Sequence, residues 1–132
     1  MNHDAQLLTM VERYRHAIHT QAAEDFLPLW NPCAVCTLIS PSDCFTGVNS
    51  IYQDFLLGGI RKAYTRIDLL TKDINVRITG DSAIVLFSYS TDCIRRETGE
   101  PFSIAGLETQ VYNQVNGEWK LTHVHYSLSP KE

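Results

Sequence analysis

Two histidines near the C-terminal end, His123 and His125, are the residues whose types and spacing most directly suggest chemistry. They follow Trp119 and Leu121 at intervals of two residues. Because side chains alternate between the two faces of a strand, all four should share one face, with the histidine Cα atoms about 6.5 to 7 Å apart. Since Trp119 and Leu121 should face the core, we expect both imidazoles to point into the core and its pocket.

Three interpretations of the histidine pair compete. The histidines could bind a metal ion with Glu108, but a site needs three or more ligands and a supporting shell. They could transfer protons at neutral pH, with Glu108 orienting one imidazole. They could also be structural groups that hydrogen-bond across strands or to Glu108. The set of metal ligands is incomplete, so no metal site is predicted. No spacing in the sequence places an acid next to a base, which also favours the structural interpretation.

Cys33 and Cys36 form a CxxC motif without a second ligand pair at a spacing suited to a metal. A redox CxxC would open a helix, whereas CAVCTLI has the composition of a strand. Residues three apart in a strand point to opposite faces. The motif is therefore interpreted as structural.

Bulk composition excludes several classes of protein. Lys and Arg number 11 against 15 Asp and Glu, for a net charge of −4, which argues against a nucleic-acid partner. The basic pairs Arg61-Lys62 and Arg95-Arg96 are expected to be solvated. No apolar run approaches the roughly 20 residues of a membrane-spanning helix, and MNHDAQLL does not look like a signal peptide. We expect a cytoplasmic protein with free thiols and one domain over residues 1–132.

The first third of the chain is predicted to be helical, and a further helix is predicted after residue 47. One apolar stripe runs through Leu7, Val11, Tyr14 and Ile18, with Asp4 as a plausible N-cap. A short helix is expected over residues 24–30. Another helix is predicted from five apolar positions and should end at Gly58-Gly59: Val48, Ile51, Tyr52, Phe55 and Leu56.

The remainder of the chain is predicted to be β. Apart from an early strand over residues 33–40 and a loop over 41–47, the strands are expected at 67–79, 82–94, 102–115 and 118–127. Apolar positions change parity within the first of these, which predicts a bend or bulge near residues 70–73. Asn116-Gly117 is typical of a type I′ hairpin turn.

Helices first and an antiparallel meander last predict an α+β fold with the helices on one face of the sheet. In SAIVLFSY, apolar residues occupy both the odd and the even positions. A strand with one solvent-exposed face should instead alternate between apolar and polar residues. Both faces should therefore be covered. The helices would cover one face, and a second copy of the chain is the simplest cover for the other.

The C-terminal segment ETQVYNQVNGEWKLTHVHYS resembles the nuclear transport factor 2-like superfamily, also called SnoaL-like or cystatin-like cones. It is most similar to the association-domain branch of calcium/calmodulin-dependent protein kinase II. The residues that carry this resemblance are Glu108, Thr109, Val111, Asn116-Gly117, Trp119, His123, His125 and Ser127. The resemblance implies a strongly curved antiparallel sheet whose concave face holds the N-terminal helices, a conical pocket between them, and dimerisation through the sheet.

Two departures from this branch concern its pocket. Tyr89 and Gln110 stand where association domains carry arginines that suit anionic ligands, which speaks against a carboxylate-binding pocket. Because members of the superfamily include enzymes, transport factors and assembly domains, the fold alone does not choose a function.

The sequence thus predicts a homodimer that binds an unknown small molecule, without a cofactor and without assigned catalysis. The alternatives are a cofactor-free isomerase or dehydratase, in which His123 or His125 works with Glu108, and a homo-oligomerisation module. The predicted pocket residues are Trp30, Tyr52, Phe55, Tyr89, Glu108, Gln110, Tyr112, His123 and His125.

Overall fold

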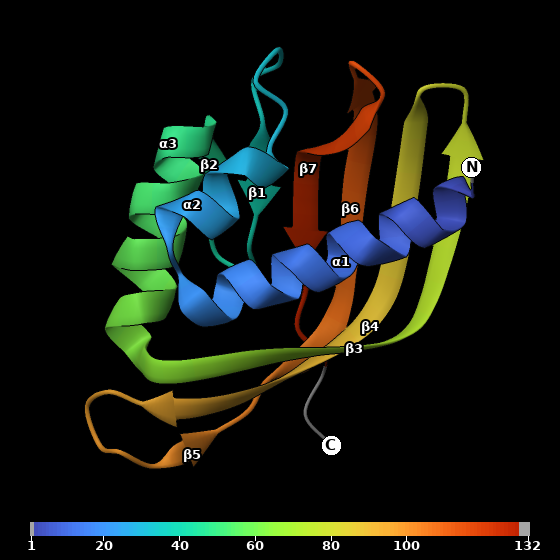
Figure 1. Ribbon diagram of the computed structural model, residues 1–132. Helices are drawn as coiled ribbons and strands as arrows, with labels where there is room; N and C mark the ends of the chain where they lie inside the picture. Colours follow the sequence, from blue (N-terminus) through green and yellow to red (C-terminus); the bar gives the residue numbers. More distant parts are fainter. Residues whose placement is uncertain (1, 130–132) are drawn as a thin grey trace.

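The computed structural model describes residues 2–129 and shows helices packed in the concave face of a strongly curved sheet (Figure 1). The helical elements are α1 (His3–Thr20), α2 (Ala23–Phe26), the 3-10 turn η1 (Leu27–Leu29), α3 (Val48–Ser50) and the π-helix η2 (Ile51–Arg61). The strands are β1 (Thr37–Ile39), β2 (Cys44–Thr46), β3 (Tyr64–Thr79), β4 (Ser82–Arg95), β5 (Pro101–Phe102), β6 (Ala105–Val115) and β7 (Glu118–Tyr126). The predicted α+β cone is confirmed.

The strand order is β2-β1-β7-β6-β4-β3, with β5 paired to β4. All neighbouring strands are antiparallel except β1 and β7, which are parallel, so the sheet is mixed and not wholly antiparallel as expected. The predicted bend in β3 is confirmed. The register with β4 shifts between Lys72 and Asn75, where Asp73 has a φ of 56°.

Two helix boundaries differ from the predictions. Asn2, and not Asp4, is the N-cap of α1, because its side chain accepts hydrogen bonds from the amides of Asp4 and Ala5. The third helix does not end at Gly58-Gly59 but continues as η2 to Arg61. Within residues 2–129, no helix is both long and apolar enough to cross a membrane.

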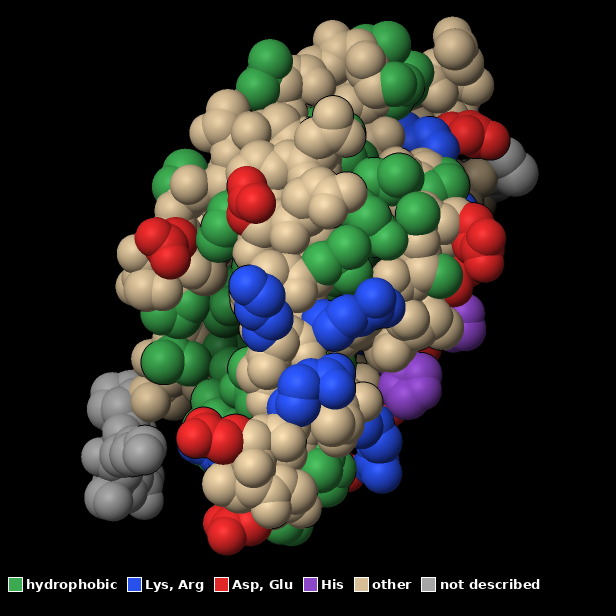
Figure 2. All heavy atoms as spheres, turned by 90° about the vertical axis from the view of Figure 1, so that its left-hand side faces the viewer, with side chains coloured by type: hydrophobic (Ala, Val, Ile, Leu, Met, Phe, Trp, Pro, Cys, Tyr) green, Lys and Arg blue, Asp and Glu red, His purple; other side chains and the backbone are tan. Residues whose placement is uncertain are grey.

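The basic pairs are exposed, as expected, yet the fold brings them side by side. The Arg96 guanidinium donates to the backbone carbonyls of Arg61 and Tyr64, at 2.9 and 3.1 Å. Figure 2 shows the face of the molecule that lies on the left in Figure 1, with Lys and Arg side chains gathered near its middle. Arg96 is thus already engaged with backbone oxygens at one end of β3.

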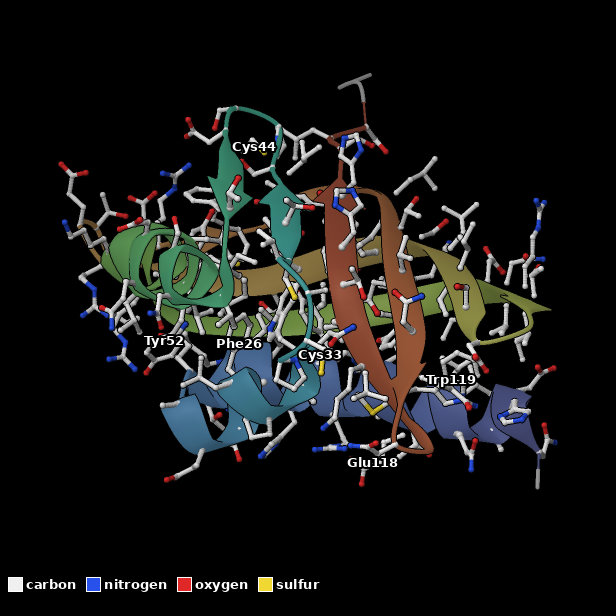
Figure 3. All side chains as sticks on the ribbon, turned by 90° about the horizontal axis from the view of Figure 1, so that it is seen from above. Phe26, Cys33, Cys44, Tyr52, Glu118 and Trp119 are labelled. Carbon is white, nitrogen blue, oxygen red and sulfur yellow. The ribbon has the colours of Figure 1, made fainter. Side chains whose placement is uncertain are left out.

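The segment around the CxxC motif is less regular than predicted. The strand begins only at Thr37, and the predicted loop contains the short strand β2. Cys36 is buried and its thiol lies 3.4 Å from the Asn31 carbonyl, whereas Cys33 is exposed. Figure 3 shows Cys33 in the linker before β1 and Cys44 on β2, well apart, and all four cysteines of the chain are free.

Candidate functional site

A cavity of about 90 Å³ lies between α1, η2 and the concave face of the sheet. Its lining is mostly apolar and aromatic, and Glu108 is the only lining residue with a carboxylate or a basic group. The lining residues are Tyr14, Ile18, Phe55, Ile60, Tyr64, Ile67, Leu69, Tyr89, Thr91, Ile104, Glu108 and Tyr126.

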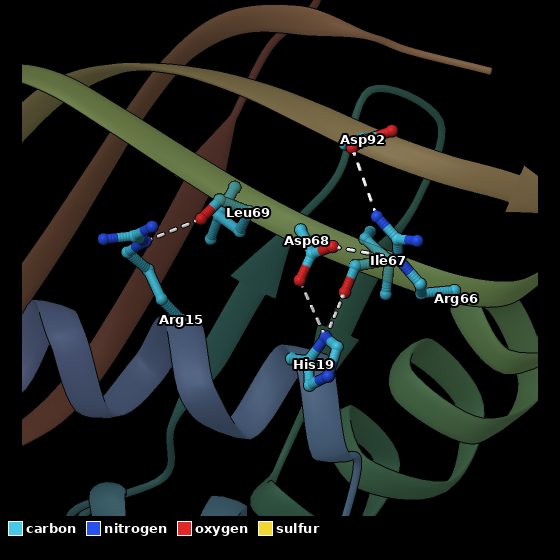
Figure 4. A network of polar contacts seen from close by, with 7 residues as sticks. All are labelled: Arg15, His19, Arg66, Ile67, Asp68, Leu69 and Asp92. Atoms are coloured by element: carbon cyan, nitrogen blue, oxygen red, sulfur yellow. Dashed lines mark hydrogen bonds and ion pairs between the residues drawn. The ribbon is translucent and has the colours of Figure 1, made fainter. Parts of the chain in front are cut away.

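Helix α1 is fixed over this cavity by the free edge of β3, as Figure 4 shows. The Arg15 Nε donates to the carbonyl of Leu69 at 2.6 Å. The His19 Nδ1 lies 3.1 Å from the carbonyl of Ile67 and 2.8 Å from the Asp68 carboxylate. Carbonyls two residues apart in an edge strand point the same way and need partners. These contacts hold the inner face of α1, with Tyr14, against the cavity.

Three polar side chains form a buried chain of hydrogen bonds along the inner face of β6. The Tyr112 hydroxyl donates to the Gln110 Oε1 at 2.6 Å, and the Gln110 Nε2 donates to the Glu108 carboxylate at 2.8 Å. Glu108 is only 4% exposed, and within residues 2–129 Gln110 is its only hydrogen-bond donor. Because a carboxylate has two acceptor oxygens, part of its capacity stays available to the cavity that it lines.

Burial changes the acidity of the groups around this cavity. Loss of solvation raises the pKa of Glu108 to about 7, although the hydrogen bond from Gln110 favours the ionised form. Burial, and then the charge of Glu108, raise the pKa of Tyr14 and raise that of Tyr126 to about 12. The tyrosines therefore remain neutral hydrogen-bonding groups, while Glu108 changes charge near neutral pH.

A second hollow of about 220 Å³ adjoins the cavity and shares Phe55, Ile60, Tyr64 and Tyr126 with it. A row of aromatic rings connects the two. The ring centroids are 5.6 Å apart for Phe45 and Phe55, 6.0 Å for Phe55 and Tyr126, and 5.8 Å for Tyr126 and Tyr89. We call these four residues the aromatic row. It leads from the second hollow to the residues around Glu108.

The histidines do not reach the cavity, because a β-bulge in β7 changes the side-chain alternation. Val111 pairs with His123 and Tyr112 with Leu121, so Thr122 is left unpaired. After the bulge, Val124 is buried, whereas His123 is half-buried and His125 exposed. The expectation that both imidazoles point inward with Leu121 is therefore wrong.

On the outer face, the histidines have neighbours of their own. The His123 Nδ1 lies 2.6 Å from the Thr37 Oγ1 on β1, and the two imidazole centroids are 6.3 Å apart. Burial, and then His125, lower the pKa of His123. Glu108 lies on the opposite face, so the predicted pairing of a histidine with Glu108, for a metal or for proton transfer, is wrong. Within residues 2–129, no three His, Cys, Asp or Glu side chains are grouped to hold a metal ion.

Only some of the predicted pocket residues meet at the cavity. Phe55, Tyr89 and Glu108 line it. Gln110 and Tyr112 support Glu108 from behind.

The other two aromatic residues of the predicted pocket lie outside the cavity lining. Trp30 is packed against Phe26 at 5.7 Å between ring centroids, with its Nε1 unpaired among residues 2–129. Tyr52 also packs on Phe26, at 5.9 Å. Figure 3 shows Tyr52 and Phe26 near one another at the helical end of the molecule.

The predicted pocket omits three tyrosines that line the cavity: Tyr14, Tyr64 and Tyr126. Tyr64 lies before the strand predicted over residues 67–79. Tyr14 belongs to the apolar stripe of α1, which gave no sign that its ring lines a cavity. In an unbroken β7, Tyr126 would lie on the face opposite His123 and His125, which were expected to point inward, whereas the bulge turns Tyr126 to the cavity. A change of parity between Leu121 and Val124, both apolar, was the available signal.

Known structures share this fold. A nuclear transport factor 2-like superfamily protein from Salmonella enterica subsp. enterica serovar Typhimurium str. LT2 is 22% identical and superposes with a TM-score of 0.90, covering 96% of this chain and 91% of that one. The dehydrochlorinase LinA-type3 from Novosphingobium barchaimii LL02 is 10% identical, with a TM-score of 0.84 and coverages of 96% and 86%. A protein of unknown function with a cystatin-like fold from Nostoc punctiforme is 13% identical, with a TM-score of 0.78 and coverages of 96% and 91%.

At such identities these likenesses establish the fold and not the activity. No curated protein matches the chain. Residues 3–130 match the sequence model of the calcium/calmodulin dependent protein kinase II association domain. The chain belongs to the calcium/calmodulin dependent protein kinase II association domain family.

Proposed function

We propose that this chain binds a small molecule in the cavity beneath α1, with Glu108 as the main polar contact. The observation that carries the proposal is a buried carboxyl group with a single donor, Gln110, on the wall of an apolar cavity. Leaving such a group in an empty apolar cavity costs stability, because it has lost its water. A ligand that supplies a partner would recover part of this loss.

Native mass spectrometry of the purified protein, compared with its denatured mass, tests the proposal. We expect a retained small organic molecule, or a thermal stabilisation of several degrees by a member of a metabolite panel. Ile104 lines the cavity, so the larger side chain of Ile104→Trp should fill it and abolish the retained mass or the stabilisation. Leu8→Trp places the same side chain on the exposed surface of α1 and should abolish neither. Binding that survives Ile104→Trp would place the ligand elsewhere.

Proton transfer is a second candidate function, since the pKa of Glu108 is raised to about 7. A group that changes charge near the working pH suits general acid–base catalysis. Tyr14 lines the same cavity, and its hydroxyl has no hydrogen-bond partner among residues 2–129. The test is exchange of a carbon-bound hydrogen of a bound ketone with deuterated solvent, followed by NMR. Glu108→Gln should stop an exchange that the wild type catalyses, and unchanged exchange would exclude this role.

The outer face of the sheet supports self-association, which we propose as the second property of the chain. Ile84 and Leu86 on β4 and Leu107 on β6 are 47%, 40% and 53% exposed. Ile84 pairs with Val111, so these apolar residues form one continuous patch beside the histidines. Apolar patches of this kind mark interaction sites.

Analytical ultracentrifugation tests the dimer. Leu86→Asp places a charge in the patch and should yield monomers at concentrations where the wild type is dimeric. Leu8→Asp is the matched control, because Leu8 on α1 is 42% exposed, close to the 40% of Leu86. A wild type that sediments as a monomer would contradict the proposal.

A further inference from the structure

Resting on the proposed binding function, we propose that the ligand presents a small organic cation, of the alkylammonium class, to Glu108 and the aromatic row. The proposed binding function does not specify the chemical class of the ligand. The cation defines the charge and the shape of the part of the ligand that lies next to Glu108. The proposal rests on three features of the cavity: its charge, its rings and its continuation outward.

The first feature is the charge of the lining. Among residues 2–129, Glu108 is the only charged group that lines the cavity, and no Lys, Arg or His lines either the cavity or the second hollow. An anion placed here would meet a carboxylate without a compensating cation, which is costly in an apolar site. A cation would instead neutralise Glu108.

The second feature is the arrangement of rings around Glu108. Phe55, Tyr89 and Tyr126 all line the cavity and belong to the aromatic row, and Tyr14 approaches from α1. Aromatic faces attract cations, and cages of such rings recognise quaternary ammonium groups. A neutral apolar ligand would use the same rings, but it would leave the buried carboxylate unpaired.

The third feature is the second hollow, which offers polar groups beyond the rings. Ser40, Ser42 and Asp43 line it together with the shared aromatic residues. The inner cavity, at about 90 Å³, is smaller than the roughly 150 Å³ cavity that binds benzene in an engineered protein. A ligand larger than one compact group would therefore extend outward. A hydroxyl group or a second amine would suit the serines and Asp43.

The basic pairs Arg61-Lys62 and Arg95-Arg96 do not oppose this assignment. The Arg61 Nε donates to the Gln21 side chain at 2.9 Å, and the Arg95 guanidinium lies 3.8 Å from the centroid of the Phe102 ring. Arg96 is bound to backbone carbonyls. These charges are exposed to solvent, where screening weakens them, whereas Glu108 is buried.

The cation also gives a defined pH dependence. The polar groups around Glu108 are Gln110 and Tyr112 from β6 and a tyrosine from each of α1, β3, β4 and β7, with Thr91 also from β4, while η2 contributes apolar side chains. Burial raises the pKa of Glu108 to about 7, so an empty site holds a proton in weak acid. A cation must displace that proton, and its affinity should fall as the pH is lowered.

Isothermal titration calorimetry with a matched pair of probes tests the inference. The probes are choline and its neutral carbon analogue, in which a tert-butyl group replaces trimethylammonium. At about pH 8 we expect choline to bind at least tenfold more tightly than the analogue, and at least tenfold more tightly than it binds at about pH 5.5. Glu108→Gln should remove the preference for choline. Glu97→Gln, which removes an exposed carboxylate, should preserve it.

The outcomes separate this inference from the proposed function. Equal or tighter binding of the neutral analogue would overturn the cation and leave a small-molecule pocket intact. Failure of both probes to bind, while the purified protein retains another molecule, would likewise overturn the cation alone. If Glu108→Gln does not fold, the two probes on the wild type at about pH 8 decide, because a preference for choline requires a buried negative charge and Glu108 is the only one among the described lining residues of the cavity.

Discussion

Two polar rows lie on neighbouring strands of the same sheet and have opposite surroundings. On β6, the row from Glu108 to Tyr112 lies on the concave face and is sealed from water. On β7, His123 and His125 lie on the convex face and reach solvent. Both rows have the same spacing of two residues. The difference shows that spacing decides which side chains share a face, whereas a bulge elsewhere in the strand decides which face that is.

The most severe way to break this comparison is to delete Lys120, which lies between Trp119 and Leu121 in β7. The two apolar residues then become direct neighbours in the strand and cannot both stay on the concave face. Removing one such large side chain from a core costs about 3 to 5 kcal/mol, and the pairing of the hairpin with β6 is shifted as well. We therefore expect the deletion to unfold much of the protein, as measured by urea denaturation followed by circular dichroism.

Deletion of Thr122 is the control, because it removes the one extra residue of the bulge and leaves Trp119, Leu121, Val124 and Tyr126 on one face with their pairing to β6 unchanged. It gives up the 2.6 Å hydrogen bond to Asn113 and should cost about 1 kcal/mol. A Lys120 deletion as stable as the Thr122 deletion would show that side-chain alternation does not set the faces of β7.

The two faces can also be compared within one strand. Phe87 and Leu86 are adjacent on β4, 1% and 40% exposed. Phe87→Ala should lower the free energy of unfolding by about 3 to 5 kcal/mol, because it opens a space in the core. Leu86→Ala should change it by no more than about 1 kcal/mol at concentrations where the chain is monomeric. Similar losses for both variants would mean that the outer face is covered within the monomer.

The fold was predictable because it rests on long periodic patterns. The α1 stripe and the apolar composition of β4 both include residues that the structure buries, such as Val11 and Val85. The site was predictable only in part. Of the predicted pocket residues, Glu108, Tyr89 and Phe55 line the cavity, whereas the histidines lie on the opposite face of the sheet from the one expected.

The physical reason is that the site depends on local irregularities. The bulge at Thr122 adds one residue to β7, so the residues after it point to the faces opposite to those that unbroken alternation predicts. The composition of the strand gives no sign of this change. The helix that passes through Gly58 likewise extends η2 to Ile60, which lines the cavity. Each is a departure from regular geometry stabilised by tertiary packing, so a periodic reading of the sequence does not detect it.

The buried row can be tested through its pH dependence. The pKa of Glu108 rises from an ordinary 4.5 to about 7 in the folded protein. Between these values the folded state holds a proton that the unfolded state has released, so stability falls as the pH rises through this window and is level above it. The total loss is about 3 kcal/mol. Glu108→Gln should remove this loss and be more stable than the wild type at about pH 8, with near equality at about pH 4, as measured by urea denaturation.

Glu118→Gln, an exposed carboxylate of β7, serves as the control and should leave the pH dependence of the wild type unchanged. If the wild type and Glu108→Gln show the same pH profile, Glu108 is ionised in the folded protein throughout, and the contrast between the two rows is smaller than the burial implies.

The exposed row should show the smallest effect. Burial, and then the neighbouring His125, lower the pKa of His123 below its usual 6.5, so its imidazole should titrate at lower pH than a free histidine. A base whose folded pKa is depressed supports the folded state above the unfolded pKa, and this support is lost as the pH falls through the folded pKa. NMR titration of the ring resonances measures the shift directly. In His125→Gln the pKa of His123 should move back toward 6.5 without reaching it, because burial is the larger cause. In Glu108→Gln it should not move at all, since the sheet separates the two groups, and a shift in that variant would mean that the faces communicate.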